Sequence, residues 1–89
     1  MSALARVFAG HRPNPVVAEP VRTMVAHCGR GGPGLDDAAG LVSDHGLDSL
    51  DRWQLLTMIE DHFDITVADD DWIKVRTTGD AINLVEKVL

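Results

Sequence analysis

The spacing of apolar residues is the feature that most limits how this chain can fold. Between residues 48 and 63, apolar side chains recur at intervals of three and four residues, as expected for an amphipathic helix: Leu55, Leu56, Met58, Ile59 and Phe63. The same spacing recurs in residues 19–28 and 78–89, and the acidic stretch 69–75 is typical of a short helical turn. The pattern therefore predicts an all-α fold, a small four-helix bundle with three main helices and one short helix.

Residues that start or stop helices set the expected boundaries. The first helix is predicted from about Glu19 to Cys28, with Pro20 in its first turn, where proline is tolerated. The second begins near Asp48 and Ser49, and the last is capped by Thr77 or Thr78 and runs to residue 89. Because Arg12-Pro13-Asn14-Pro15 interrupts any helix upstream, residues 1–15 are expected to be an N-terminal arm, disordered or a short helix, preceding a domain over residues 16–89.

Eighty-nine residues supply one modest core, which suits a single domain. The helical stripes and the apolar residues between them predict which side chains fill it. The expected core residues are Val21, Met24, Val25, Leu41, Leu55, Ile59, Phe63, Val67, Val75, Ile82 and Val85.

Charge is very unevenly distributed along the chain. The formal net charge is −6, yet residues 36–71 carry ten Asp and Glu60 against Arg52 alone, a net −10 for that block. Such an acidic surface argues against nucleic-acid binding, because phosphate contacts need basic side chains. No apolar run approaches the length of a membrane span, and the start of the chain does not resemble a secretory signal, so we expect a cytoplasmic protein that does not bind membranes.

Motifs for nucleotide binding, metal binding and catalysis are not evident in the sequence. The glycines at 29, 31 and 34 match the dinucleotide pattern, but neither a strand before them nor a helix start after them is predicted. The four histidines and the single Cys28 have no metal-ligand spacing, and the Asp runs do not match a calcium-binding loop. No nucleophile–base pair is evident. The sequence therefore predicts neither an enzyme nor a metal site.

The segment Gly46-Leu47-Asp48-Ser49-Leu50 is the remaining candidate. Asp-Ser-Leu alone is an ordinary helix cap, but it follows a long loop and opens an acidic amphipathic helix. Phe63-Asp64-Ile65-Thr66-Val67, an acidic turn and Val75-Arg76-Thr77-Thr78-Gly79-Asp80-Ala81-Ile82 come after it. In this order and spacing the chain resembles the acyl and peptidyl carrier protein family over roughly residues 19–89.

The resemblance implies a function for Ser49. In the family, the serine of Asp-Ser-Leu receives 4′-phosphopantetheine from coenzyme A, a step performed by a phosphopantetheinyl transferase with its own Mg²⁺. The arm ends in a thiol that carries cargo as a thioester, so the protein is a shuttle without turnover of its own, and we expect it to act as a monomer. The transferase, an acyl- or aminoacyl-loading ligase or transferase and downstream synthases are the implied partners. Implied docking residues on the acidic helix are Asp48, Leu50, Asp51, Trp53, Glu60 and Asp61.

Several positions depart from the fatty-acid carriers of the family. Gln54 replaces a usual Glu, Arg52 adds a positive charge, and Asp44-His45-Gly46 stands where Asp-Leu-Gly is common. Trp72 replaces a small residue near the acyl pocket, where an indole either fills space that a long chain would enter or only completes the core. His45 either influences the attachment site or only faces water. These departures favour a specialised biosynthetic pathway; a housekeeping fatty-acid carrier and an unmodified protein-interaction module are the alternatives.

Overall fold

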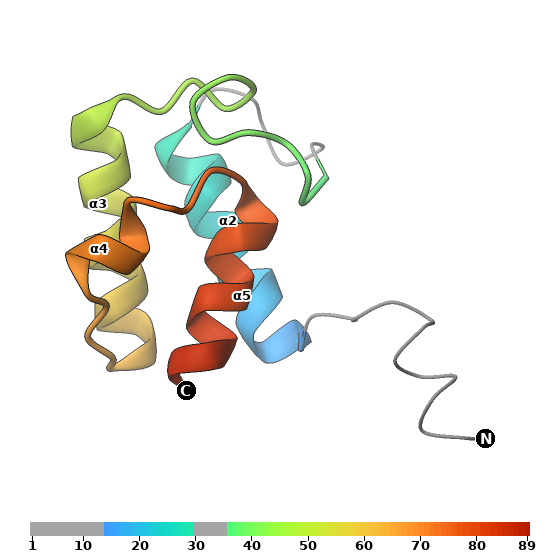
Figure 1. Cartoon of the computed structure of the whole chain (residues 1–89). Coiled ribbons are helices and arrows are strands. Elements are labelled where there is room, and N and C mark those ends of the chain that lie inside the picture. Colours follow the sequence, from blue (N-terminus) through green and yellow to red (C-terminus); the bar gives the residue numbers. More distant parts are fainter. Residues whose placement is uncertain (1–13, 30–35) are drawn as a thin grey trace.

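The computed structural model describes residues 14–29 and 36–89. Within these two ranges it contains four helices and no strand: α2 (Pro15–Cys28), α3 (Ser49–Phe63), α4 (Asp69–Trp72) and α5 (Thr78–Val88). Figure 1 shows the three long helices side by side, with the short α4 next to α3. The predicted all-α bundle of three main helices and one short helix is confirmed. Most of the predicted N-terminal arm and of the glycine-rich run lies outside the described residues.

The start of α2 differs from the prediction. The helix begins at Pro15 instead of near Glu19, because Asn14 caps it: its side-chain oxygen accepts a hydrogen bond of 3.0 Å from the Val16 N–H. Pro15 then occupies the first turn, where its missing N–H is not needed. Pro20 therefore lies inside the helix and not in its first turn. Both prolines suit a first turn, and only the cap on Asn14 decides between them.

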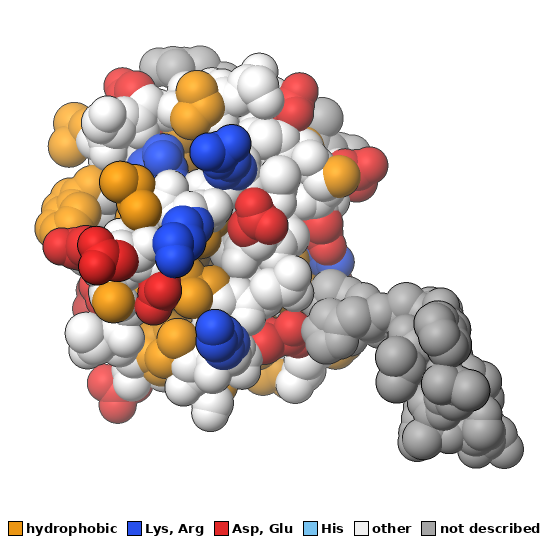
Figure 2. Space-filling model, in the orientation of Figure 1, with side chains coloured by type: hydrophobic (Ala, Val, Ile, Leu, Met, Phe, Trp, Pro, Cys, Tyr) orange, Lys and Arg blue, Asp and Glu red, His pale blue; other side chains and the backbone are white. Residues whose placement is uncertain are grey.

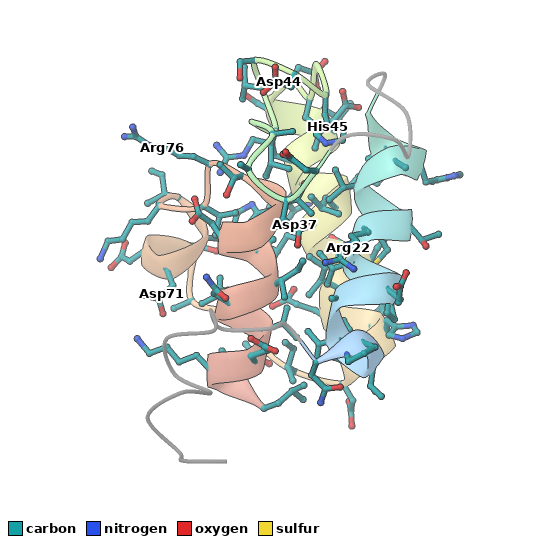
Figure 3. All side chains as sticks on the ribbon, turned by 90° about the vertical axis from the view of Figure 1, so that its right-hand side faces the viewer. Arg22, Asp37, Asp44, His45, Asp71 and Arg76 are labelled. Atoms are coloured by element: carbon teal, nitrogen blue, oxygen red, sulfur yellow. The ribbon has the colours of Figure 1, made fainter. Side chains whose placement is uncertain are left out.

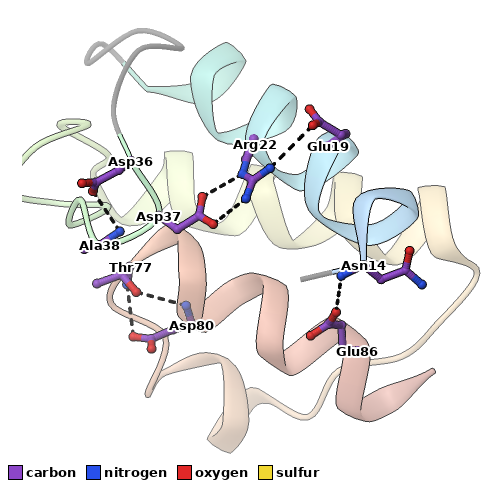
Figure 4. A network of polar contacts seen from close by, with 9 residues as sticks. All are labelled: Asn14, Glu19, Arg22, Asp36, Asp37, Ala38, Thr77, Asp80 and Glu86. Carbon is purple, nitrogen blue, oxygen red and sulfur yellow. Dashed lines mark hydrogen bonds and ion pairs between the residues drawn. The ribbon is translucent and has the colours of Figure 1, made fainter. Parts of the chain in front are cut away.

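The boundaries of α3 and α5 agree with the prediction. Asp48 caps α3, which ends at Phe63, where Asp64 adopts a left-handed conformation (φ 54°) that stops the helix. Thr77 caps α5 by accepting a hydrogen bond from the Asp80 N–H, while the Asp80 carboxylate accepts one from the Thr77 N–H (Figure 4). The caps fix the helix ends because each satisfies backbone groups that the helix itself cannot pair.

One apolar core lies between the helices, and α2 packs against both α3 and α5. All predicted core residues are buried except Phe63, which is half-buried. Phe63 is the last residue of α3, so part of its ring extends past the packed region and lies edge-on to His62. The buried hydrophobic residues outside the predicted list are Val17, Ala18, Ala39, Leu47, Leu56, Trp72 and Ala81; for Trp72 a core position was one of the two alternatives drawn from the sequence.

The loop before α3 is fastened to the bundle at several points. Arg22 on α2 donates hydrogen bonds of 2.8 and 2.6 Å to the two carboxylate oxygens of Asp37, as Figure 4 shows. The Asp37 carbonyl accepts a hydrogen bond from the Gly79 N–H, and the Leu41 N–H donates to the Arg76 carbonyl. These contacts hold the loop across α2 and the start of α5, which fixes the direction from which the chain enters α3.

Substitution of Asp37 tests this fastening. The Arg22 guanidinium, through its hydrogen bonds, holds the pKa of the Asp37 carboxyl below its ordinary value of 3.8. The resulting stability is present above that value and is lost as the pH falls through the lower folded-state pKa. We expect Asp37→Asn to lower the free energy of unfolding by about 1 kcal/mol at neutral pH. The free energies of unfolding of the wild type and the variant should approach each other as the pH falls below about 4.

Urea denaturation at a series of pH values measures this difference. Asp61→Asn is a matched control, because Asp61 is exposed on α3 and should change stability little. A difference between wild type and Asp37→Asn that persisted unchanged to pH 2 would contradict the role given to the ion pair.

Candidate functional site

Ser49 is the first residue of α3 and is exposed to solvent. Before it, Gly46 adopts a positive φ of 71°, and Leu47 buries its side chain in the core. Asp48 then caps the helix: its carboxylate accepts the Asp51 N–H at 2.8 Å, while the Asp51 carboxylate accepts the Asp48 N–H at 3.2 Å. The turn, the buried leucine and the reciprocal cap together hold the Ser49 hydroxyl at the surface.

A shallow groove of about 270 Å³ adjoins Ser49 between α3 and α4. Besides the serine, the groove is lined by two indoles, an isoleucine, one cation and one carboxylate. The lining residues are Ser49, Arg52, Trp53, Asp69, Trp72 and Ile73. Figure 2 shows hydrophobic side chains gathered at this edge of the molecule, with Lys and Arg side chains near them. The sequence patterns point to Ser49, Arg52, Trp53 and Trp72 but not to Asp69 and Ile73 as residues of this site. Their proximity to Ser49 follows from how α4 lies against α3, which the predicted helical turn at residues 69–75 does not indicate.

Arg52 links α3 to the chain that follows α4. Its Nη2 donates hydrogen bonds to the backbone carbonyls of Trp72 (3.2 Å) and Val75 (2.7 Å), and its guanidinium lies 5.8 Å from the centre of the Trp72 ring system. Hydrogen bonds to a charged group contribute about 1.5–3 kcal/mol each, and a cation over an indole face adds to them. In the described part of the chain, Arg52 has no carboxylate within ion-pair distance. Its charge is therefore held by neutral carbonyls and an aromatic ring.

The predicted docking residues divide into two groups. Asp48, Leu50, Asp51 and Trp53 lie together at the N-terminal end of α3, with Leu50 73% and Trp53 59% exposed. Glu60 and Asp61 lie near the other end of the helix, about 15 Å further along at the helical rise.

The acidic residues on α3 also differ in what they contact. The carboxylates of Asp48 and Asp51 serve the helix cap, and Glu60 accepts a hydrogen bond of 2.8 Å from the Val67 N–H. Glu60 thereby helps hold the connection from α3 to α4. Asp61, by contrast, is exposed.

His45 does not face water. Its side chain is 3% exposed, and neither ring nitrogen has a hydrogen-bond partner among the described residues. It packs where the loop meets the end of α2: a Cβ built on Gly29 would lie 2.9 Å from the Cβ of His45. Figure 3 shows His45 beside this end of α2, while Asp44 stands in the loop and accepts a hydrogen bond of 2.6 Å from the Gly40 N–H. The loop that leads to Ser49 therefore buries its own His45 ring, next to the end of α2.

No group of three or more potential metal ligands occurs in residues 14–29 and 36–89. Of the helices described, none has both the length and the apolar character that a bilayer-spanning segment needs. The burial of Cys28 raises the pKa of its thiol, and its Sγ lies 3.6 Å from the Met58 sulfur. A raised pKa disfavours the reactive thiolate, which makes Cys28 a packing residue.

Comparison with known proteins agrees with this geometry. The family described as the phosphopantetheine attachment site matches residues 21–85. Acyl carrier proteins of Sinorhizobium fredii (strain NBRC 101917 / NGR234) and Rhizobium meliloti (strain 1021) are each 33% identical over 72 residues, which cover 80% of this chain and 92% of theirs. A solved structure from Mycobacterium tuberculosis, titled a putative acyl carrier protein, superposes with a TM-score of 0.75 at 32% identity, covering 82% of this chain and 99% of that one.

The chain belongs to the phosphopantetheine attachment family of carrier proteins. Members are carriers and not enzymes, and their cofactor is covalently attached 4′-phosphopantetheine. The general acyl-carrier function, the fold and the cofactor expected from the sequence are thereby confirmed. An exposed serine at a helix N-terminus, beside an open groove, suits such an attachment, because a phosphodiester is favoured by the positive end of the helix dipole.

Replacement of Arg52 tests its link between α3 and α4. Arg52→Met retains most of the side-chain length but removes every donor, so the Trp72 and Val75 carbonyls lose their partner. We expect the free energy of unfolding to fall by about 2 kcal/mol, with faster backbone amide hydrogen exchange in residues 69–75. Urea denaturation and hydrogen exchange read by mass spectrometry measure the two effects.

Arg76→Met is the matched control, because Arg76 is exposed and its hydrogen bonds to Leu41 and Asp80 use only its backbone. We expect it to leave exchange in residues 69–75 within twofold of the wild type. Equal exchange in Arg52→Met and the wild type would show that these hydrogen bonds do not hold α4.

Proposed function

We propose that Ser49 bears the 4′-phosphopantetheine arm and that the protein shuttles a thioester-linked acyl or aminoacyl group between enzymes. The observation that carries the proposal is the exposed hydroxyl of Ser49 at the first residue of α3, on the rim of the groove. Ser43 is also exposed, but it lies in the preceding loop, where its hydroxyl contacts the Asp44 carboxylate at 3.4 Å. Ser49 thus combines access with a helix terminus suited to a phosphate.

The attachment step transfers a phosphoryl-linked group from coenzyme A. The Ser49 oxygen forms a bond to the phosphorus next to the pantetheine, and the bond from that phosphorus to the bridging pyrophosphate oxygen breaks. Adenosine 3′,5′-bisphosphate leaves, and the hydroxyl proton passes to a base of the transferase. The chain needs no base of its own for this reaction, since the transferase supplies the activation and Mg²⁺.

Local charges support a phosphodiester at this position. The helix dipole places partial positive charge at the N-terminus of α3, and Arg52 stands one turn along from Ser49, where side chains three positions apart are neighbours. The Asp48 and Asp51 carboxylates engage each other's backbone N–H groups, which spreads their charge into the cap. The arm itself supplies a terminal thiol that forms the thioester with the cargo.

The same end of α3 is proposed to dock partner enzymes. Leu50 and Trp53 expose apolar surface beside Ser49, and aromatic residues of this kind supply much of the energy in protein interfaces. Asp48, Asp51, Glu60 and Asp61 surround or extend this surface and would steer basic patches on a transferase, a loading ligase and downstream synthases. We expect the protein to meet these partners in the cytoplasm and as a monomer.

The composition of the groove favours a specialised pathway over housekeeping fatty-acid synthesis. Trp72 and Arg52 occupy the space between α3 and α4, where a long acyl chain would need room. An unmodified interaction module is the alternative function, and the exposed Leu50 and Trp53 are the observation that favours it. Modification of Ser49 distinguishes the two.

Intact mass tests the attachment. After incubation with coenzyme A, Mg²⁺ and a broad-specificity phosphopantetheinyl transferase, we expect one phosphopantetheine to be added to the wild type and none to Ser49→Ala. Ser43→Ala, which removes the exposed loop serine, should be modified like the wild type. An unmodified wild type, or addition to Ser49→Ala, would refute the proposal.

A pair of substitutions tests the docking role of the acidic residues. Asp61→Asn removes an exposed charge, so it should slow association with the transferase severalfold at low salt and leave stability unchanged. Glu60→Gln weakens the hydrogen bond to Val67 as well, so it should lower the free energy of unfolding by about 1 kcal/mol. Stopped-flow association rates and urea denaturation measure the two quantities.

The slowing by Asp61→Asn should vanish as salt is raised to where the Debye length is about 8 Å or less. An association rate of the wild type that did not change with ionic strength would count against electrostatic steering while leaving the attachment unaffected.

A further inference from the structure

The groove beside Ser49 is open along its surface side. Ser49 forms part of its lining, so an arm attached there starts at the groove, and when the arm folds back over the surface its acyl end can lie along the groove. Trp53 and Ile73 are 59% and 71% exposed and offer apolar surface on which a short acyl group can lie. The groove therefore provides a resting place that requires no rearrangement of the bundle.

The way from this groove into the core is closed by Trp72. The indole is only 8% exposed, and it belongs to the same buried cluster as Leu55, Val75 and Ile82. It is thus both the inner wall of the groove and a member of the core. An acyl chain that entered the core would have to displace this indole from its packing.

Arg52 keeps Trp72 in this position. Its two hydrogen bonds reach the carbonyl of Trp72 itself and that of Val75, so they join the first turn of α3 to the chain on both sides of residue 73. The Arg52 Nε is buried without a partner in the described part of the chain, which places the stem of the guanidinium within the packed interior. Separation of α3 from α4 would break both hydrogen bonds.

The geometry points to a carrier whose acyl group stays outside: the cargo lies in the groove of Ser49, Trp53 and Ile73, and Trp72, held by Arg52, excludes it from the core. The inference rests on the proposed attachment at Ser49. It defines the substrate class as short acyl groups that remain accessible to enzymes while bound to the carrier. Trp72 and Arg52 are the residues that set this specificity, Arg52 as a positioning residue.

Thermal unfolding of loaded carriers tests the inference. Acetyl, butyryl and octanoyl forms are prepared with the corresponding acyl-coenzyme A, and intact mass verifies each. Because a chain inserted into the core stabilises the folded state, Tm should rise with chain length only where the core admits it. We expect the Tm values of the acetyl and octanoyl wild type to differ by less than about 1 °C. In Trp72→Ala we expect the Tm of the octanoyl form to be higher than that of the acetyl form by about 4 °C or more.

Phe63→Ala is the matched control, because it also removes an aromatic ring packed against the core, but about 20 Å along α3 from Ser49. Its Tm should not depend on chain length. If Trp72→Ala does not fold, Trp72→Leu replaces it. The measurement is then the rate at which hydroxylamine cleaves the thioester. That rate should be equal within twofold for the acetyl and octanoyl wild type and at least threefold slower for octanoyl Trp72→Leu than for its acetyl form.

A wild-type Tm that rises with chain length, or an octanoyl thioester protected from hydroxylamine in the wild type, would overturn the inference. Variants at Trp72 that remain indifferent to chain length would overturn the role given to this residue. Failure of loading is seen beforehand by mass, so it is distinguished as a failure of the attachment at Ser49 itself.

Discussion

The apolar face of α2 is the surface on which the rest of the molecule is assembled. Both α3 and α5 pack against it, and its residues Val17, Val21 and Val25 are among the most completely buried in the chain. A protein of this size buries only a small core, so the loss of this face would leave the other helices without a common partner. The position of Ser49 depends on the same helix, because α2 also carries Arg22, which fastens the loop leading into α3.

The acidic residues of α3 serve folding as well as the docking role proposed for them. Asp48 and Asp51 satisfy backbone N–H groups at the start of the helix, and Glu60 satisfies one in the connection that follows it. A carboxylate used in this way keeps its charge, so it can still contribute to the field that a basic partner meets. The self-repulsion of the acidic block is therefore offset in part by hydrogen bonds within the block. A partner would find the acids already oriented by the helix cap.

The sequence predicted the helices better than the segments between them. The ends of α3 and α5 could be placed because Asp48, Thr77 and Asp80 are capping residues at the required spacing. The start of α2 could not, because Pro15 and Pro20 satisfy the same first-turn rule and only the cap formed by Asn14 distinguishes them. The helical spacing alone places Phe63 in the core. Spacing does not indicate whether the end of a helix extends past the packed region, as the end of α3 does.

In the candidate site, too, local features could be predicted from the sequence and contacts between distant segments could not. Ser49 was found from a short motif in its context, because that signal is local. The groove was not predicted as a whole, since it depends on how α4 lies against α3, and a helix of four residues has no periodicity that states which side faces inward. The burial of His45 and Leu47 likewise follows from the path of a loop. Arg52 was noted as a charge, but its hydrogen bonds span twenty residues or more, and no spacing rule covers such contacts.

Whether an acyl chain can enter the bundle depends on two free energies: the cost of displacing Trp72 and the gain from burying the methylenes of the chain. Displacement of an indole that buries about 150–250 Å² costs about 4–6 kcal/mol, and the two hydrogen bonds of Arg52 are together of the order of 3–6 kcal/mol. An acyl chain gains about 0.8 kcal/mol for each methylene that it buries. Entry therefore breaks even only on the order of ten methylenes, and shorter chains are more stable in the groove than in the core. In this carrier the length of cargo that stays accessible is thus set by one indole and one guanidinium, and that indole belongs to the same buried core as the apolar face of α2.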